Sequence, residues 1–229
     1  MTITAPILIK KKEQFDDIYL NLHQSIRAHS THVGIVTGVM ARLCKERLLN
    51  EYNLPKGKLE ITIIRGGDYH DIGLHFISYV LCQKTGPLSE TETAAVRQHP
   101  GYTVRLLCEY ENVLFESEGA KQIALDMGRY HHEHHDGSGY PKGLKGDEIP
   151  FVSQLCSLAD TLDKVAGDRR RNSFNSAVEI ISENKGIRFS PEAVDCFLQS
   201  QNEIRKLYIG KNSWIKASAK EARNGQTED

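Results

Sequence analysis

The densest group of metal-ligating side chains in the sequence lies between residues 131 and 136. This window reads His-His-Glu-His-His-Asp, so it holds four imidazoles and two carboxylates, and it runs directly into a Gly-Ser-Gly-Tyr-Pro turn. Imidazole nitrogen and carboxylate oxygen together suit divalent Fe, Mn, Zn or Ni. A rigid turn beside such a cluster can shape the wall of a pocket. The window therefore indicates metal chemistry.

Other candidate ligands are spread along the chain, and the sequence around each one predicts its place on a helix. His70 and Asp71 precede a glycine, which is typical of a helix end, so both side chains can reach an ion beyond that end. His32 opens an amphipathic helix, and His99 is expected in the helix that begins with a Ser-Glu-Thr-Glu capping box. Asp160 follows an apolar run typical of a buried helix, where an unpaired carboxylate is costly.

The remaining sequence predicts helices almost throughout. Apolar residues recur at spacings of three and four, alternating strand patterns are scarce, and Ser190-Pro191-Glu192 is a further helix start signal. Long non-helical stretches are predicted at 76–88 and 136–150. We expect one all-α domain, a single helical bundle. Its predicted boundaries are an N-terminal helical extension at 1–27, the domain at 28–208 and a polar, loosely ordered C-terminal tail at 209–229.

The composition argues against several classes of protein. The net charge of -1 shows no basic bias, which argues against a protein that binds nucleic acid polymers. The five cysteines are widely separated and form no Cys-x-x-Cys pair, which disfavours a disulfide framework or a thiolate zinc site. No segment reaches the ~18 apolar residues of a membrane span. The N-terminal charges follow the apolar run, which is the wrong order for a signal peptide. We expect a cytoplasmic protein.

Five motifs together resemble those of the HD-GYP family of bacterial phosphodiesterases. The segment from His131 to Pro150 is similar to the signature of that family, and His70-Asp71-Ile72-Gly73 is similar to its HD motif. Segments 84–89 and 98–100 fall where the family has related segments, and 158–163 together with 168–169 resemble its last motif. The resemblance spans residues 28–200 and implies an HD-type helical bundle with an elongated Gly-Tyr-Pro loop.

The resemblance also implies a centre of two divalent metal ions. The ligands that it implies for one ion are His32, His70, Asp71 and Asp160. Those for the second ion are Asp71, His99, His131 and His132, so Asp71 would bridge the ions, with His70 and Asp71 as the catalytic pair. This set has no thiolate, which favours Fe or Mn, with Zn or Ni as alternatives. The other histidines are expected to be ordinary surface or core residues: His23, His29, His75, His134 and His135.

The resemblance further implies substrate contacts from Arg169, Tyr140 and Lys142. Tyr140 could stack on a guanine base, hydrogen-bond a phosphate, or only shape its loop. Two positions depart from the family pattern. Leu74 stands where the family usually has a lysine that contacts substrate phosphate, and Asn172 stands at a second basic position, where Arg170 or Arg171 could substitute.

A further departure favours two ions over three, because Ala28 stands where some members have a metal-recruiting glutamate. Gly66-Gly67 either loosens the helix before the HD motif or marks a tight helix crossing.

Three functions are consistent with this sequence. The first is metal-assisted hydrolysis of cyclic di-GMP to linear pGpG, with GMP as a further product left open. The second is a weakened family member that binds metal or cyclic di-GMP and signals through protein partners, because Leu74 and Asn172 replace basic residues. The third is an HD-type hydrolase or oxygenase for another substrate, such as a different cyclic dinucleotide or a phosphonate.

Overall fold

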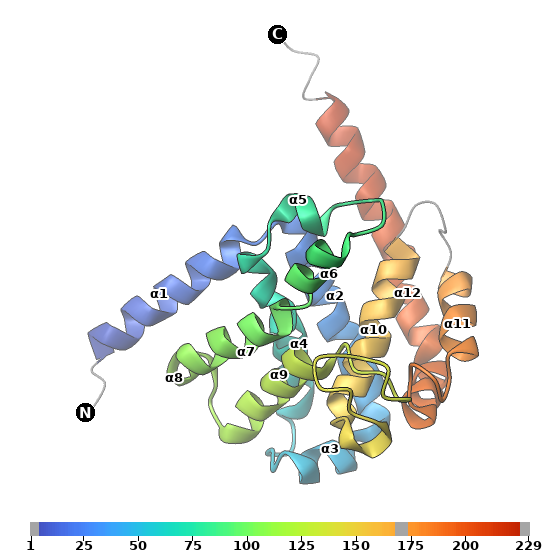
Figure 1. Ribbon diagram of the computed structural model, residues 1–229, viewed down its shortest axis with the longest axis horizontal. Helices are drawn as coiled ribbons and strands as arrows, with labels where there is room; N and C mark the ends of the chain where they lie inside the picture. Colours follow the sequence, from blue (N-terminus) through green and yellow to red (C-terminus); the bar gives the residue numbers. More distant parts are fainter. Residues whose placement is uncertain (1–4, 168–173, 225–229) are drawn as a thin grey trace.

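The computed structural model describes residues 5–167 and 174–224, and the side chains of 6–167 and 174–208 (Figure 1). The helices of the described residues are α1 (Ala5–Asn21), α2 (Gln24–Ala41), α3 (Lys45–Glu51), α4 (Leu59–Tyr69), α5 (Tyr79–Cys82), α6 (Glu90–Val96), α7 (His99–Glu109), α8 (Glu111–Leu114), α9 (Glu118–Tyr130), α10 (Phe151–Gly167), α11 (Phe174–Glu183) and α12 (Pro191–Asn224). Short 3-10 helices lie at η1 (Arg42–Cys44), η2 (Ile72–Phe76) and η3 (Gly146–Glu148). Over these residues there is no β-strand, so the all-α prediction is confirmed.

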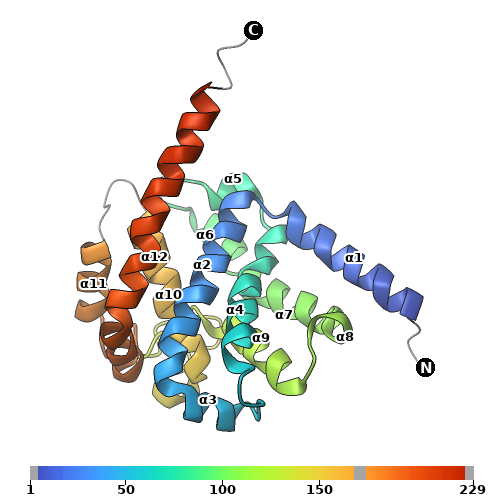
Figure 2. The ribbon, with the colours of Figure 1, turned by 180° about the vertical axis from the view of Figure 1, so that it is seen from behind.

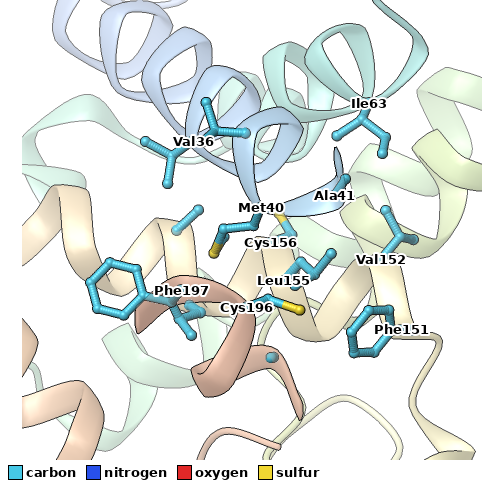
Figure 3. Close-up of a cluster of buried hydrophobic side chains, with 14 of the residues drawn as sticks. Val36, Met40, Ala41, Ile63, Phe151, Val152, Leu155, Cys156, Cys196 and Phe197 are labelled. Carbon is cyan, nitrogen blue, oxygen red and sulfur yellow. The ribbon is translucent and has the colours of Figure 1, made fainter. Parts of the chain in front are cut away.

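The main core forms where α2, α10 and α12 pack together. Every residue of α10 from Phe151 to Asp163 is buried, as expected of a helix enclosed on all sides. Figure 3 shows Met40 of α2 beside Leu155 of α10 and Phe197 of α12, all fully or nearly fully buried. The helix that carries Asp160 is therefore fixed by apolar packing along most of its length.

The crossing of α2 and α4 is unusually close because both helices contribute glycine. A Cβ atom at Gly67 would lie 2.1 Å from the Cα of Gly34, and one at Gly34 would lie 2.5 Å from the carbonyl oxygen of Ile64. The two helix backbones thus touch directly. Of the two interpretations of Gly66-Gly67, the structure supports the tight crossing, which brings the start of α2 and the end of α4 toward a common point.

A second apolar cluster attaches α1 to the bundle. Phe15 of α1 is buried with Ile72 of η2 and Leu107 of α7. The N-terminal part of α1 and the C-terminal part of α12 extend from the bundle in different directions (Figures 1 and 2). None of the helices in the described part of the chain is both long and apolar enough to cross a lipid bilayer.

Two local start signals are confirmed. Ser89 and Glu92 form the capping box of α6, and Ser190 accepts a hydrogen bond from the backbone N–H of Ala193 at the start of α12. The prediction that His99 belongs to the capped helix was wrong. That helix ends at Val96, and a new helix, α7, starts at His99 because Pro100 suits a first turn.

The other differences concern boundaries. The stretch 76–88, predicted to be non-helical, contains the short helix α5, whereas 136–150 holds only η3. The predicted boundaries at 27/28 and 208/209 fall inside α2 and α12, and α12 is helical to Asn224.

Candidate metal centre

Helix ends from separate parts of the chain meet at the centre of the bundle. His70 caps the C-terminus of α4, His131 caps that of α9, and His99 begins α7. Asp160 enters from the middle of α10 and His29 from the first turns of α2. Side chains at helix ends can point along the helix axis, so residues distant in sequence reach one small volume.

The first group of candidate ligands consists of Asp71, His99, His131 and His132, whose ligand atoms all lie within 4.8 Å of one another. The Nε2 atoms of His99 and His131 lie 3.1 and 3.3 Å from Oδ1 of Asp71. The Nε2 atoms of His132 and His99 are 3.2 Å apart. Four donor atoms this close, three of them imidazole nitrogens, have the spacing that one cation would need.

The second group consists of His29, His70, Asp71 and Asp160, again with ligand atoms within 4.8 Å of one another. Nε2 of His29 lies 2.9 Å from Oδ1 of Asp160, and Nε2 of His70 lies 3.4 Å from Oδ2 of Asp71. Asp71 belongs to both groups, offering Oδ1 to the first and Oδ2 to His70 of the second. One carboxylate thus joins two adjoining candidate sites.

Backbone carbonyls fix the orientation of three of these imidazoles. Nδ1 of His70 donates to the carbonyl oxygen of Gly67 at 2.7 Å, and Nδ1 of His131 donates to that of Met127 at 2.8 Å. Nδ1 of His99 donates to the carbonyl oxygen of Val96 at 2.7 Å. Because Nδ1 faces a carbonyl, Nε2 points into the centre, as in proteins that hold a metal through Nε2.

Several atoms at the centre lack a hydrogen-bond partner. Nε2 of His70, Oδ1 of Asp71 and Nε2 of His131 are completely buried and make no hydrogen bond. Buried polar atoms in native proteins are nearly always satisfied, and a divalent cation would satisfy all three at once. The residues present therefore fit a metal ion on their own geometry.

The charges at the centre favour a cation. Burial opposes ionisation of Asp71, but His70 and His99 hold its pKa well below the usual range. Burial likewise opposes ionisation of Asp160, but Lys164 and His29 hold its pKa well below the usual range. Burial would lower the pKa of His70, yet the adjacent Asp71 carboxylate raises it to about 10. Two ionised carboxylates thus draw positive charge into a buried site.

The neighbouring His132 behaves differently. Burial first, and the nearby His131 second, lower the pKa of His132 well below its ordinary value. A neutral imidazole is the form that binds a metal ion.

The second group contains His29, whereas the ligand predicted from the sequence was His32. Three residues along a helix advance by about 4.5 Å, so His32 lies almost one turn farther along α2. Its Nδ1 is 3.2 Å from Oδ1 of Asp163, and its ring packs edge-on against Tyr208. Nδ1 of His29 instead donates to Oδ2 of Asp163 at 2.7 Å, so that Nε2 faces Asp160.

His29 was predicted to be an ordinary surface or core histidine, because the motif resemblance assigned the ligand position to His32. The spacing of Asp160 and Asp163 was the available signal. Two carboxylates on one face of a buried helix require partners, and His29 is the residue whose two ring nitrogens contact both of them.

The Gly-Tyr-Pro loop is tied to the centre through Tyr140 and Glu133. The ring of Tyr140 stacks on that of His132 with 4.7 Å between ring centroids, and the guanidinium of Arg97 lies 4.9 Å from the centre of the same ring. The Tyr140 ring therefore already has stacking partners, which favours a role in holding His132 over stacking on a guanine base. The carboxylate of Glu133 is buried and accepts hydrogen bonds from the backbone N–H groups of Lys142 and Leu144 at 2.6 and 3.0 Å.

A cavity of about 580 Å³ opens on this centre. Its walls include Asp71, His99 and His132 of the centre, together with Leu74, Tyr140 and Lys164. The exposed side chain of Lys142 is not part of these walls. Arg169, the third predicted substrate contact, and Asn172 lie outside the described residues.

An all-α bundle in which two His/Asp groups share one buried carboxylate defines a class of helical, metal-binding protein. A family model described as "HD domain" matches residues 27–193. The chain therefore belongs to the HD domain family.

Curated relatives extend the comparison. The chain is 28% identical over 201 residues to 3'3'-cGAMP-specific phosphodiesterase 2 of Vibrio cholerae, covering 86% of this chain and 37% of the relative. It is 28% identical to a cyclic di-GMP phosphodiesterase of Thermotoga maritima, covering 79% of this chain and 46% of that protein. It is 34% identical to a probable cyclic di-GMP phosphodiesterase of Vibrio cholerae, covering 62% of this chain and 33% of the relative. The chain thus spans less than half the length of these relatives.

Two solved structures share the fold. Bd1817, an HDG"Y"P protein of Bdellovibrio bacteriovorus, aligns with a TM-score of 0.58 at 19% identity, covering 82% of this chain and 55% of that chain. A cyclic GMP-AMP specific phosphodiesterase of Vibrio cholerae aligns with a TM-score of 0.52 at 18% identity, covering 78% of this chain and 45% of that chain. At these identities the likeness concerns the helical fold.

Proposed function

We propose that this chain hydrolyses a phosphodiester bond of a cyclic dinucleotide and that cyclic di-GMP is its principal substrate. The observation that carries the proposal is the pair of His/Asp groups that share Asp71 beside an open cavity. The names of the relatives, which specify cyclic di-GMP or cGAMP, support the substrate class.

The proposed metal centre would hold two divalent ions, and Asp71 would be a ligand in both groups. The proposed ligands of one ion are His29, His70, Asp71 and Asp160, and those of the other are Asp71, His99, His131 and His132. An all-nitrogen and oxygen ligand set favours Fe or Mn. When bound, such a pair of ions would withdraw charge from the phosphoryl group and stabilise both the entering and the leaving oxygen.

The remaining work falls to residues of this chain. Gly67, Val96 and Met127 hold three imidazoles in the orientation for binding through Nε2 by accepting their Nδ1 protons. Tyr140 holds the plane of His132 by stacking on it. Because these contacts exist before substrate binds, the centre is preorganised, which lowers the barrier more than contacts formed during the reaction.

The proposal is tested by following both candidate substrates with one preparation. The protein would be purified under anaerobic conditions, loaded with Fe or Mn, and incubated separately with cyclic di-GMP and 3'3'-cGAMP. Chromatography would follow the linear products, including pGpG and GMP. We expect linear product from cyclic di-GMP at the higher kcat/KM, and none after Asp71→Asn. If the metal-loaded protein forms no linear product from either cyclic dinucleotide, the proposal is refuted.

A second candidate function rests on the apolar side chain of Leu74 in the cavity wall. A wall without charge at this point weakens phosphate binding, so the chain could instead bind a cyclic dinucleotide without turnover and signal through a protein partner. Two ions per chain with micromolar binding of cyclic di-GMP, but no linear product, would favour this function over hydrolysis.

A further inference from the structure

We propose that Lys164 supplies the cationic contact to a phosphate group of the bound cyclic dinucleotide. The inference rests on the proposed function and deepens it, because it names the residue that recognises the charge of the substrate. Lys164 belongs to α10 and lies one helical turn after Asp160.

The charge balance of the cavity calls for such a residue. Among its described lining residues, Asp71 and Asp163 carry carboxylates, Leu74 is apolar, and Lys164 is the one lysine or arginine. A phosphodiester is an anion, and removing an anion from water beside two carboxylates is costly unless a cation compensates. Among the described side chains of the wall, Lys164 is the lysine or arginine that can add to the positive charge of the proposed ions.

The geometry places the ammonium group of Lys164 between the metal centre and the cavity. Its Nζ lies 2.8 Å from both carboxylate oxygens of Asp160, while the side chain is 52% exposed. An ammonium carries three donors on a flexible four-carbon stem. One donor can therefore stay on Asp160 while another turns toward a ligand in the cavity.

Occupation of the centre strengthens this assignment. The oxygens of Asp160 that Lys164 contacts belong to the second group of candidate ligands. A cation at this group would share Asp160 with the ammonium, so Asp160 would hold Nζ less strongly while the other donors of Nζ stay available to a ligand in the cavity.

A merely structural role predicts a different outcome. If Lys164 only neutralises Asp160, its removal should change the metal content of the protein and leave binding of the dinucleotide at a filled centre unaffected. If Lys164 binds phosphate, removal should weaken binding and reduce its dependence on salt, because an ion pair with the substrate is screened by salt.

The first experiment compares Lys164→Gln with Lys58→Gln, a control at an exposed lysine outside this cavity with similar side-chain exposure, 55%. Ions per chain, KM for cyclic di-GMP, and equilibrium binding of a phosphorothioate analogue of cyclic di-GMP would be measured at two salt concentrations. For Lys164→Gln we expect two ions, a KM and Kd at least tenfold higher, and a weaker salt dependence. Lys58→Gln and Lys164→Arg should remain within threefold of the unmodified protein.

The second experiment tests rescue from another wall. Leu74 lines the same cavity, so Leu74→Lys added to Lys164→Gln should recover at least threefold of the lost affinity for the analogue. Recovery supports a phosphate contact, because a lysine at position 74 would restore charge to the cavity wall without restoring the pair with Asp160.

Three results would overturn the inference. In the first, Lys164→Gln has a KM and Kd within twofold of the unmodified protein. In the second, Lys164→Gln loses affinity and loses bound ions in the same proportion. In the third, adding Leu74→Lys to Lys164→Gln recovers no affinity. If the unmodified protein neither binds nor hydrolyses a cyclic dinucleotide, the proposed function itself is wrong and the inference falls with it. If the unmodified protein hydrolyses the dinucleotide and Lys164→Gln has the same KM and Kd, the role of Lys164 is refuted while the proposed function stands.

Discussion

The imidazole of His29 is held at both ring nitrogens by carboxylates of α10. Nδ1 donates to Asp163 at 2.7 Å, and Nε2 faces Asp160 at 2.9 Å. A carboxylate behind a metal-binding histidine fixes its tautomer and raises its basicity. Asp163 is therefore a positioning residue for His29, and it also contacts the hydroxyl of Tyr208 at 3.1 Å.

This arrangement predicts different metal contents for two histidine variants. His29→Ala should lose one ion per chain, because it removes a donor atom of the second group. His32→Ala should keep both, because its ring contacts Asp163 and Tyr208 and His32 belongs to neither group of candidate ligands. Plasma mass spectrometry of the two proteins, loaded in parallel, provides the comparison. Loss of an ion from His32→Ala but not from His29→Ala would restore the prediction made from sequence.

At the scale of elements, the Gly-Tyr-Pro loop depends on one buried carboxylate. Glu133→Ala would leave the backbone N–H groups of Lys142 and Leu144 without their acceptor. Each buried unsatisfied donor costs about 1–3 kcal/mol, so the loop should open to water. We expect hydrogen exchange over residues 139–146 to accelerate at least tenfold. The exposed Glu148, which accepts only from Lys145 in the same loop, provides the control variant Glu148→Ala.

Equal acceleration of exchange in Glu148→Ala and Glu133→Ala would show that the buried carboxylate has no special role. The same experiment reports on His132, because Tyr140 of this loop stacks on its ring.

The crossing of α2 and α4 gives a prediction for stability. Gly67→Ala places a Cβ atom 2.1 Å from the Cα of Gly34, and backbone atoms cannot move aside as a side chain can. Overpacking typically costs about 1–3 kcal/mol, and more where the backbone must shift. We expect a loss of at least ~3 kcal/mol in urea unfolding.

The matched control is Gly101→Ala in α7, where an added Cβ meets nothing within 4 Å. This change should raise the free energy of unfolding by up to ~1 kcal/mol, because alanine favours a helix over glycine. Similar stability of the two variants would contradict the close crossing.

Sequence signals at this scale predicted helix starts better than helix connections. The capping box at Ser89 and the start at Ser190 are short-range hydrogen-bond patterns, so they can be read locally. The break between α6 and α7 and the short helix α5 depend on packing against other elements, which no local pattern contains. For the same reason, apolar spacing did not reveal that α2 and α12 continue across the expected boundaries.

The candidate ligands likewise include some residues that the sequence predicted and some that it did not. The motif resemblance grouped six of the residues that the structure brings together: His70, Asp71, His99, His131, His132 and Asp160. It chose His32 over His29, although both rings contact Asp163 of α10, because the height along α2 that brings His29 to Asp160 follows from helix packing and not from local sequence. Lys164 was not predicted, although its spacing of four from Asp160 is typical of a helical ion pair.

For the whole molecule, the centre should couple metal binding to stability. The candidate ligands come from α2, α4, α7, α9 and α10, so unfolding would disperse them. An ion at 100 times its Kd adds about 2.7 kcal/mol for one site. For a chain of this size, that corresponds to a rise in Tm of about 5–10 °C.

The measurement is calorimetry of the metal-loaded protein before and after exhaustive chelation. The Asp71→Asn variant provides the control, because it should show little response to chelation. An unchanged Tm in the parent protein would indicate that the groups do not bind metal when folded.

The decisive experiment on the shared Asp71 carboxylate counts ions per chain and follows turnover of cyclic di-GMP on the same anaerobic preparation. The two groups that share Asp71 predict two ions per chain and conversion to linear product. Two ions without conversion of any cyclic dinucleotide would leave a binding protein in place of an enzyme. Well under one ion per chain after reconstitution would contradict the account of the centre itself.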